Sequence, residues 1–169
     1  MSKAPAYHTP VLLQACIDNL NILPNGIYVD LTFGGGGHSA EILKKLGPNG
    51  KLFAFDQDED AQANSLKDAR FTLIPQNFRF LKNYLRLHGI TEVDGILGDL
   101  GVSSHQFDVP ERGFSIRFNA DLDMRMNRKS SLTAQMILNE YDEKKLTTIF
   151  REYGEVLEPH KLARLIVLS

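Results

Sequence analysis

Four short apolar runs alternate with helix-like stretches between residues 26 and 101, and this order constrains the fold more than any other feature of the sequence. The runs are rich in β-branched and aromatic residues, whereas the stretches between them repeat apolar residues at helical spacing. We expect strands over residues 26–33, 51–58, 70–78 and 93–101, and helices over residues 38–47, 59–68 and 79–89. Strands joined through helices run parallel, so the alternation predicts an α/β fold with a doubly wound sheet.

The carboxyl ends of these four strands carry the most unusual residues of the sequence. They read "DLTFGGGGHS" from residue 30, "FDQD" from residue 55, "QNF" from residue 76 and "GDLGVSSHQ" from residue 98. In doubly wound sheets, ligands bind in the crevice outside the carboxyl ends of the strands. We therefore expect the functional site at this edge of the sheet.

The glycine loop, residues 34–37, is entropically costly, so something must approach its backbone closely. Gly35, Gly37 and Ala40 satisfy the degenerate G-x-G-x-x-A dinucleotide pattern, and Asp56 follows about 20 residues later, where an acid binds ribose hydroxyls. On this spacing alone, a nicotinamide cofactor is reasonable. A tight strand-to-helix turn without any ligand is the other reading.

Three further features favour S-adenosylmethionine. Asp30 can face the cationic end of a methionine moiety, whereas it would repel a pyrophosphate. His38 and Ser39 follow the glycines at the start of a helix, where backbone amides can hold the cofactor's carboxylate, although His38 can also be a capping residue. Asp99 ends the fourth strand beside the first, where the transferred group would sit.

The alternation stops after residue 101. An irregular stretch over residues 102–131 leads to helical patterns over 131–154 and 158–169, with Ser131 or Thr133 as a helix start and Gly154 as a stop. No fifth strand follows, and the sequence ends inside an apolar helical pattern, so we expect a fragment of a longer protein. The fourth strand would then leave an open edge, which can recruit a second copy as a homodimer.

Composition limits the remaining classes of function. No apolar run approaches the roughly 20 residues of a membrane span, so we expect a soluble, cytoplasmic protein. The single cysteine, Cys16, excludes an internal disulfide and a structural zinc site, and we expect no metal. The net charge of −2 confines any nucleic-acid contact to a local patch. Residues 111–129 are the candidate, with five basic against three acidic side chains among aromatic residues, or else a solvated loop.

Six blocks together carry a specific resemblance. They are "YHTPVLL" (7–13), "DLTFGGGGHS" (30–39), "FDQDEDA" (55–61), "GDLGVSSHQFD" (98–108), "ERGFS" (111–115) and "LDMRM" (122–126). In this order the sequence resembles the MraW/RsmH family of bacterial small-subunit rRNA cytosine-N4 methyltransferases, from residue 7 to its end.

The resemblance implies a Rossmann-like, class I S-adenosylmethionine-dependent methyltransferase fold with a helical insertion domain after the fourth strand. Residues 1–105 would form the N-terminal part of the methyltransferase domain, and residues 106–169 the start of the substrate-recognition insertion. The substrate would be the N4 amine of a cytosine in the decoding region of 16S rRNA, within the small ribosomal subunit. Complete members of the family are longer than this sequence and add further strands.

The resemblance also assigns residues to the site. Gly36, Gly37 and His38 would bind the cofactor, Asp56 the ribose, and Phe78 would pack near the adenine, with Asp99 and Gln106 completing the pocket. Plain core packing is the alternative for Phe78. In the basic stretch, Arg112, Phe114, Arg117 and Arg125 are suited to RNA phosphates and bases.

Asp99 is the catalytic candidate. A cytosine amine is a poor nucleophile because its lone pair is delocalised, so we expect Asp99 to accept a hydrogen from the amine or to orient the cofactor. The sequence Asp99-Leu100-Gly101-Val102 lacks the prolines and aromatic residue that many amino methyltransferases have there. A nicotinamide-dependent oxidoreductase and a catalytically silent, cofactor-binding fragment remain as alternatives.

Overall fold

The computed structural model describes residues 10–169, so the beginning of the "YHTPVLL" block lies outside the described residues. The chain divides into two compact units, Met1–Ser103 and Ser104–Ser169. The proposed division into a methyltransferase part, 1–105, and an insertion, 106–169, stays a prediction.

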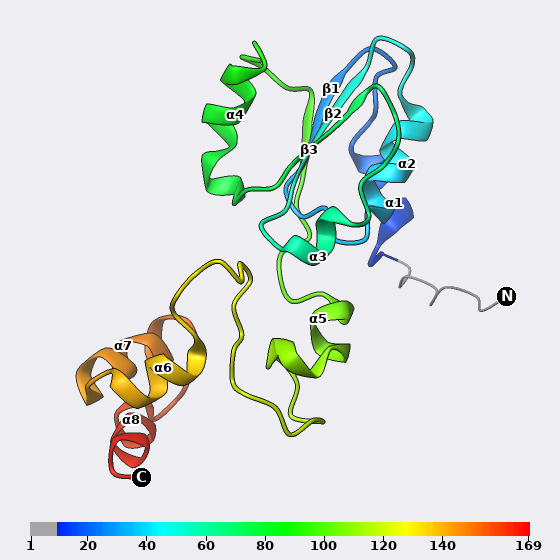
Figure 1. The fold of residues 1–169 in the computed structure, drawn as a ribbon. Coiled ribbons are helices and arrows are strands. Elements are labelled where there is room, and N and C mark those ends of the chain that lie inside the picture. The colour runs from blue at the N-terminus through cyan, green and yellow to red at the C-terminus, as the bar shows by residue number, and fades with distance from the viewer. Residues whose placement is uncertain (1–9) are drawn as a thin grey trace, which may run out of the picture. The chain divides into compact units, whose positions relative to one another are not determined.

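The first unit contains a four-stranded parallel sheet (Figure 1). Its strands are β1 (Ile27–Asp30), β2 (Lys51–Phe55), β3 (Phe71–Ile74) and β4 (Gly95–Leu97). Their order is β3-β2-β1-β4, with Val29 opposite Phe53 on one side and Ile96 on the other. The predicted parallel α/β sheet is confirmed, although each strand is shorter than the apolar run that predicted it.

Helices cover both faces of this sheet, as Figure 1 shows: α1 (Leu13–Asn19) and α2 (Gly37–Lys45) lie on one side and α4 (Leu81–Leu87) on the other. Side chains of successive strand residues point to opposite faces. Tyr28 and Leu52 therefore join the core under α1 and α2, whereas Val29 and Phe53 join the core under α4. Burial on both faces explains why the strands read as apolar runs.

Two connections differ from their predictions. The helix expected over 59–68 is the single turn α3 (Glu59–Gln62), which begins where the Asp58 side chain accepts a hydrogen bond from the Asp60 amide. The strand expected over 70–78 ends at Ile74, and residues Phe78–Phe80 form the short helix η1 before α4. Helix α1 was not predicted, although apolar residues recur at positions 13, 17 and 20.

The second unit consists of short helices around an irregular loop. They are α5 (Ser104–Asp108), η2 (Pro110–Arg112), α6 (Ala134–Glu140), α7 (Glu143–Glu152) and α8 (Pro159–Val167). The pattern over 131–154 divides into α6 and α7, because Thr133 caps the first helix and Asp142 caps the second. Helices α7 and α8 pack against each other. Within residues 10–169, no helix is both long and apolar enough to cross a membrane.

Candidate functional site

Asp56 lies at the centre of the strand-end edge, directly after β2. Its Oδ2 accepts a hydrogen bond of 2.8 Å from the Gly34 amide, and its Oδ1 accepts one of 2.9 Å from the Asp58 amide. On the other side of Gly34, the Asn64 side-chain amide donates to the Gly34 carbonyl at 3.0 Å. The carboxylate and the glycine loop, 22 residues apart in sequence, are thus held together.

Three glycines of the loop, Gly34, Gly36 and Gly37, differ in what a side chain would meet at each position. Gly34 has φ 50° and Gly36 has φ 76°, a region that glycine adopts without steric cost. A Cβ at Gly34 would meet nothing nearer than the Thr32 carbonyl at 4.0 Å, so space is open above it. A Cβ at Gly36 would lie 2.9 Å from the Phe33 ring, and one at Gly37 would collide with Pro10. Of these three glycines, Gly34 is the one that leaves open space for a ligand against the loop.

Helix α2 starts at the end of this loop. Gly36 is its N-cap residue and provides no side-chain hydrogen bond to the first amides. His38 is buried, and its Nε2 lies 3.2 Å from the Val11 carbonyl oxygen. The His38 side chain therefore belongs to the interior, and any contact of residues 36–38 with a ligand is made through the backbone.

Asp30 is fully buried at the end of β1, which corrects its predicted role. Its Oδ2 accepts a 2.7 Å hydrogen bond from the Ser39 hydroxyl, and its Oδ1 accepts one of 3.0 Å from the Thr32 amide. Burial raises the pKa of this carboxyl above its usual value, and the Ser39 hydrogen bond opposes the rise. Asp30 ties the end of β1 to the first turn of α2, and it does not face a ligand.

Asp99 follows β4 and is exposed. Its amide donates a 2.8 Å hydrogen bond to Oγ1 of Thr32, which lies two positions before the glycine loop. This bond fixes the backbone at the end of β4 next to the end of β1, while the Asp99 carboxylate faces solvent. Asp99 thus lies on the same edge as the glycine loop, as the strand order predicts.

Phe78 also belongs to this edge, but it begins η1 and does not end β3. Its side chain is 38% exposed, which disagrees with plain core packing. The preceding Asn77 caps η1 and donates a 3.0 Å hydrogen bond to the Gln57 side chain, which joins the connections after β3 and β2. Gln106, by contrast, lies in the second unit, where it is buried and donates to Met126 Sδ at 3.4 Å. Its role in a cofactor pocket stays a prediction.

The irregular segment over residues 111–126, called the 111–126 loop, encloses Arg112, which is therefore not available to RNA. Its side chain is fully buried, and Nη2 donates a 2.8 Å hydrogen bond to the Arg125 carbonyl. The Arg125 guanidinium pairs with the Asp123 carboxylate at 2.6 Å and lowers the pKa of that carboxyl, while donating to the carbonyls of Arg128 and Ser130. The prediction that Arg112 contacts phosphate is wrong, and Arg125 is engaged within its own loop.

Residues 115–119, called the 115–119 tip, carry exposed side chains at positions 116 to 119. Ile116 is completely exposed, Phe118 is 39% exposed, and the Arg117 guanidinium lies 5.5 Å from the Phe118 ring centroid. Arg117 also pairs with Asp108 at 2.7 Å, but both side chains are more than half exposed. Apolar, aromatic and basic groups are therefore presented together by this tip.

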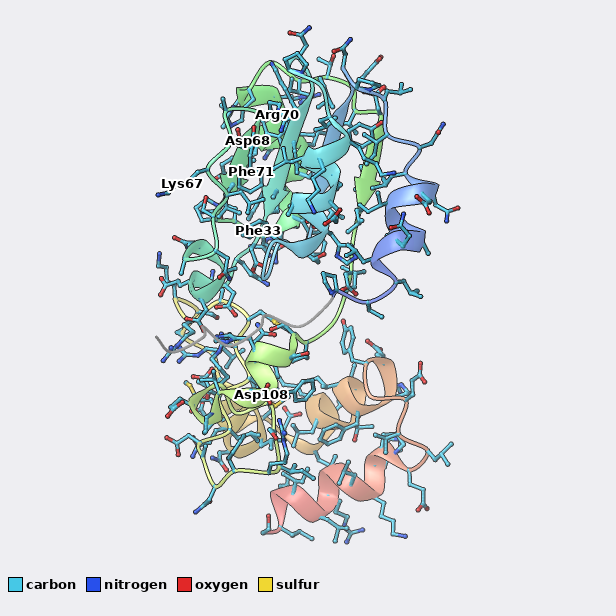
Figure 2. All side chains as sticks on the ribbon, turned by 90° about the vertical axis from the view of Figure 1, so that its right-hand side faces the viewer. Phe33, Lys67, Asp68, Arg70, Phe71 and Asp108 are labelled. Carbon is cyan, nitrogen blue, oxygen red and sulfur yellow. The ribbon has the colours of Figure 1, made fainter. Side chains whose placement is uncertain are left out.

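A shallow hollow of about 300 Å³ lies elsewhere in the first unit, between α2 and residues 66–70. Figure 2 labels Lys67, Asp68 and Arg70 of its lining, which precede β3 and so lie at the opposite end of that strand from the glycine loop. Asp68 and Arg70 form an ion pair of 2.6 Å, and the Arg70 hydrogen bonds lower the pKa of Asp68 to about 2. The hollow is a structural feature apart from the strand-end site.

Sequence reasoning missed three residues that shape the site. The Thr32 side chain positions the Asp99 backbone, and the Asn64 side chain positions the glycine loop, each through a hydrogen bond. Thr32 stands within the strand-end block and could have been chosen for its hydroxyl, whereas nothing in the sequence marks Asn64. Pro10 reaches Gly37 only through the three-dimensional fold.

The family model and the curated relatives identify the same family. A family model described as "MraW methylase family" matches residues 5–169. Proteins named "Ribosomal RNA small subunit methyltransferase H" from Flavobacterium johnsoniae and Flavobacterium psychrophilum are each 65% identical, over 99% and 92% of this chain. The matches cover 55% and 54% of those relatives, so the chain spans about half their length. A crystal structure titled as an rRNA methylase from Streptococcus thermophilus is 29% identical over 51% of each chain, with a TM-score of 0.38, which is too low to add support.

Proposed function

Because the chain belongs to the MraW methylase family, we propose that it forms the cofactor-binding part of an S-adenosylmethionine-dependent rRNA methyltransferase. The acceptor that we propose is the N4 amine of a cytosine in the decoding region of 16S rRNA, within the small ribosomal subunit in the cytoplasm. The names of the Flavobacterium relatives support the ribosomal substrate. The observation that carries the proposal is the Asp56 carboxylate, fixed beside the open backbone of Gly34.

The strand-end edge fits S-adenosylmethionine in three respects. The open space above Gly34 lets a ligand approach the loop backbone, and the first amides of α2, which receive no side-chain cap from Gly36, suit the carboxylate of the methionine moiety. Asp56 accepts hydrogen bonds from two backbone amides, and carboxylate oxygens are equally suited to accept from ribose hydroxyls. Phe78 offers a partly exposed ring to a purine.

Asp99 is the proposed group for the acceptor. When bound, S-adenosylmethionine supplies a methyl group activated by the sulfonium charge. The exposed Asp99 carboxylate would accept a hydrogen bond from the cytosine amine and so direct its lone pair. The hydrogen bond from the Asp99 amide to Thr32 fixes the backbone from which this carboxylate extends.

Calorimetric titration of the chain with S-adenosylmethionine tests the proposal. We expect binding, and we expect Asp56→Ala to weaken it by about 1 to 3 kcal/mol, because two hydroxyl hydrogen bonds are lost. Asn64→Ala is the matched control, since it removes the other side-chain bond to Gly34 but keeps the carboxylate, and its effect should be smaller. Equal binding by Asp56→Ala and the parent chain would contradict the ribose assignment. Tight binding of NAD and none of S-adenosylmethionine would replace the proposal with an oxidoreductase.

We propose that the 115–119 tip contacts the RNA. An exposed arginine beside an exposed aromatic ring suits phosphate contact and base stacking. Arg117→Ala should weaken binding to undermodified small subunits and reduce the slope of log affinity against log salt by about 1, whereas Phe118→Ala should weaken binding without changing that slope. Filter binding at several salt concentrations measures both quantities.

Arg151→Ala in α7 is the control for this experiment, because it removes the same charge from an exposed position of the same unit. S-adenosylmethionine affinity should stay constant in all three variants. If Arg117→Ala and Arg151→Ala behave alike, the tip makes no specific contact with the particle and the 111–129 stretch is a solvated loop.

A further inference from the structure

Residues 10–12, the strap, lie directly against the first turn of α2. The Val11 carbonyl oxygen is 3.2 Å from Nε2 of His38, whose ring is buried. Pro10 lies against Gly37, the first residue of the helix. The strap thus touches the two successive residues at which the glycine loop becomes a helix.

The nearest contacts of a side chain at position 37 would all be with Pro10. A Cβ there would collide with Pro10 Cγ and would lie 3.0 Å from Pro10 Cδ and 3.6 Å from Pro10 Cβ, with no other residue among its three nearest atoms. Gly37 does not have a positive φ, and it begins an α-helix, where alanine is preferred to glycine. Neither the backbone conformation nor the helix therefore requires glycine at this position.

The chain leaves the strap through a backbone conformation that is unfavourable for its residue. Leu12 has φ 49° and ψ 27°, in the left-handed region that leucine rarely adopts, and its side chain is 71% exposed. Such a conformation persists only where the surrounding structure fixes it. Here α1 follows at once and packs on α2 through Ile17, so contacts on both sides of Leu12 fix the bend.

We infer that the strap is a positioning element for the ligand site, and that Pro10 and Val11 set the orientation of the first turn of α2. This inference rests on the proposed function, in which the first amides of that turn receive the carboxylate of S-adenosylmethionine. Gly36 supplies no side-chain cap, so the amides depend on backbone placement alone. The Pro10 ring against Gly37 and the Val11 carbonyl against His38 supply that placement.

A rescue experiment tests the inference in the 169-residue chain. Gly37→Ala should displace the strap, speed exchange of the Ala40 amide, which is bonded to the Gly36 carbonyl at 2.8 Å, and weaken S-adenosylmethionine binding about tenfold or more. Pro10→Ala removes Cγ and Cδ and leaves the Cβ at an ordinary contact distance of 3.6 Å. The double variant Pro10→Ala/Gly37→Ala should therefore recover the urea midpoint, the Ala40 exchange rate and the affinity of Pro10→Ala, within about twofold.

Gly50 and Pro24 form the matched control pair. A Cβ at Gly50 would lie 2.7 Å from the Pro24 carbonyl oxygen, an atom that Pro24→Ala retains. Pro24→Ala should consequently fail to rescue Gly50→Ala. This contrast separates relief of a specific ring contact from any general effect of removing a proline.

The possible results test the role of the strap and the proposed function independently. Failure of Pro10→Ala to restore stability and Ala40 exchange to Gly37→Ala overturns the strap contact, and recovery of both without recovery of affinity overturns its positioning role. If the parent chain does not bind S-adenosylmethionine at all, the proposed function fails. In that case, the Ala40 exchange rates of the single and double variants still test whether the strap positions the first turn of α2.

Discussion

Gly113→Ala is expected to destabilise the second unit by about 3 kcal/mol or more. Gly113 has φ 70°, and a Cβ there would lie 2.5 Å from the Asp123 amide nitrogen and 2.6 Å from the Asp121 carbonyl oxygen. Both are backbone atoms, so no flexible side chain can move aside. Residues 112–113 would have to separate from residues 121–124, and the hydrogen bond from the Met124 amide to the Arg112 carbonyl would break.

Gly89→Ala is the control for backbone strain. Gly89 has a similar φ of 72°, but a Cβ there would meet nothing within 4 Å, so the substitution should cost only about 1 to 2 kcal/mol. Urea unfolding gives both costs, and exchange of the Met124 and Ala134 amides reports the second unit alone. Similar costs for the two variants would show that the 111–126 loop can open at Gly113 without penalty.

The 111–126 loop shows why a charged, aromatic stretch is ambiguous in sequence. The loop has few regular elements, so its stability depends on the buried Arg112 and on the Arg125–Asp123 pair. Burial of a guanidinium is costly unless carbonyls accept its hydrogen bonds, and the Arg125 carbonyl is one such acceptor. Two of the arginines that appeared suited to RNA, Arg112 and Arg125, therefore support the loop, whereas Arg117 is exposed at the tip and pairs with Asp108.

The sheet and its functional edge could be predicted because they depend on local patterns. Strands buried on both faces leave continuous apolar runs, and parallel order places all their carboxyl ends together. Asp56 and the glycine loop follow from this rule, and their hydrogen bond agrees with it. The assignments of Gly36, Gly37, His38, Phe78, Asp99 and Gln106 to cofactor contacts stay predictions.

Two kinds of feature could not be predicted: a helix start inside a continuous helical pattern, and contacts between distant segments. The helical pattern over 131–154 gave no sign that Asp142 starts a second helix, because an aspartate inside a helical pattern is also an ordinary surface residue. The burial of Asp30 and the approach of Pro10 to Gly37 each require a neighbour from another part of the chain. Spacing along the sequence carries no information about such neighbours.

Self-association through the edge of β4 is the second large effect that we expect. Among the strands of the described part of the chain, β4 pairs with β1 alone, so its other side has no strand partner there. Its central residue, Ile96, is 48% exposed, and an open, apolar edge strand is a template for pairing with a second chain. Light scattering should therefore show a mass that rises with concentration, and Ile96→Lys should return it to that of a monomer.

Leu87→Lys in α4 separates the strand edge from exposed apolar surface in general. Leu87 is 79% exposed, more than Ile96, and the substitution adds the same charge to the same unit, but the residue lies on a helix. Pairing at an edge requires free backbone groups, which a helix does not offer, so Leu87→Lys should associate as the parent chain does. Equal dissociation by both variants would mean that charge alone disperses the chains. A parent chain that stays monomeric at all concentrations would mean that the short β4 edge is too weak a template, and the proposed homodimer would be wrong.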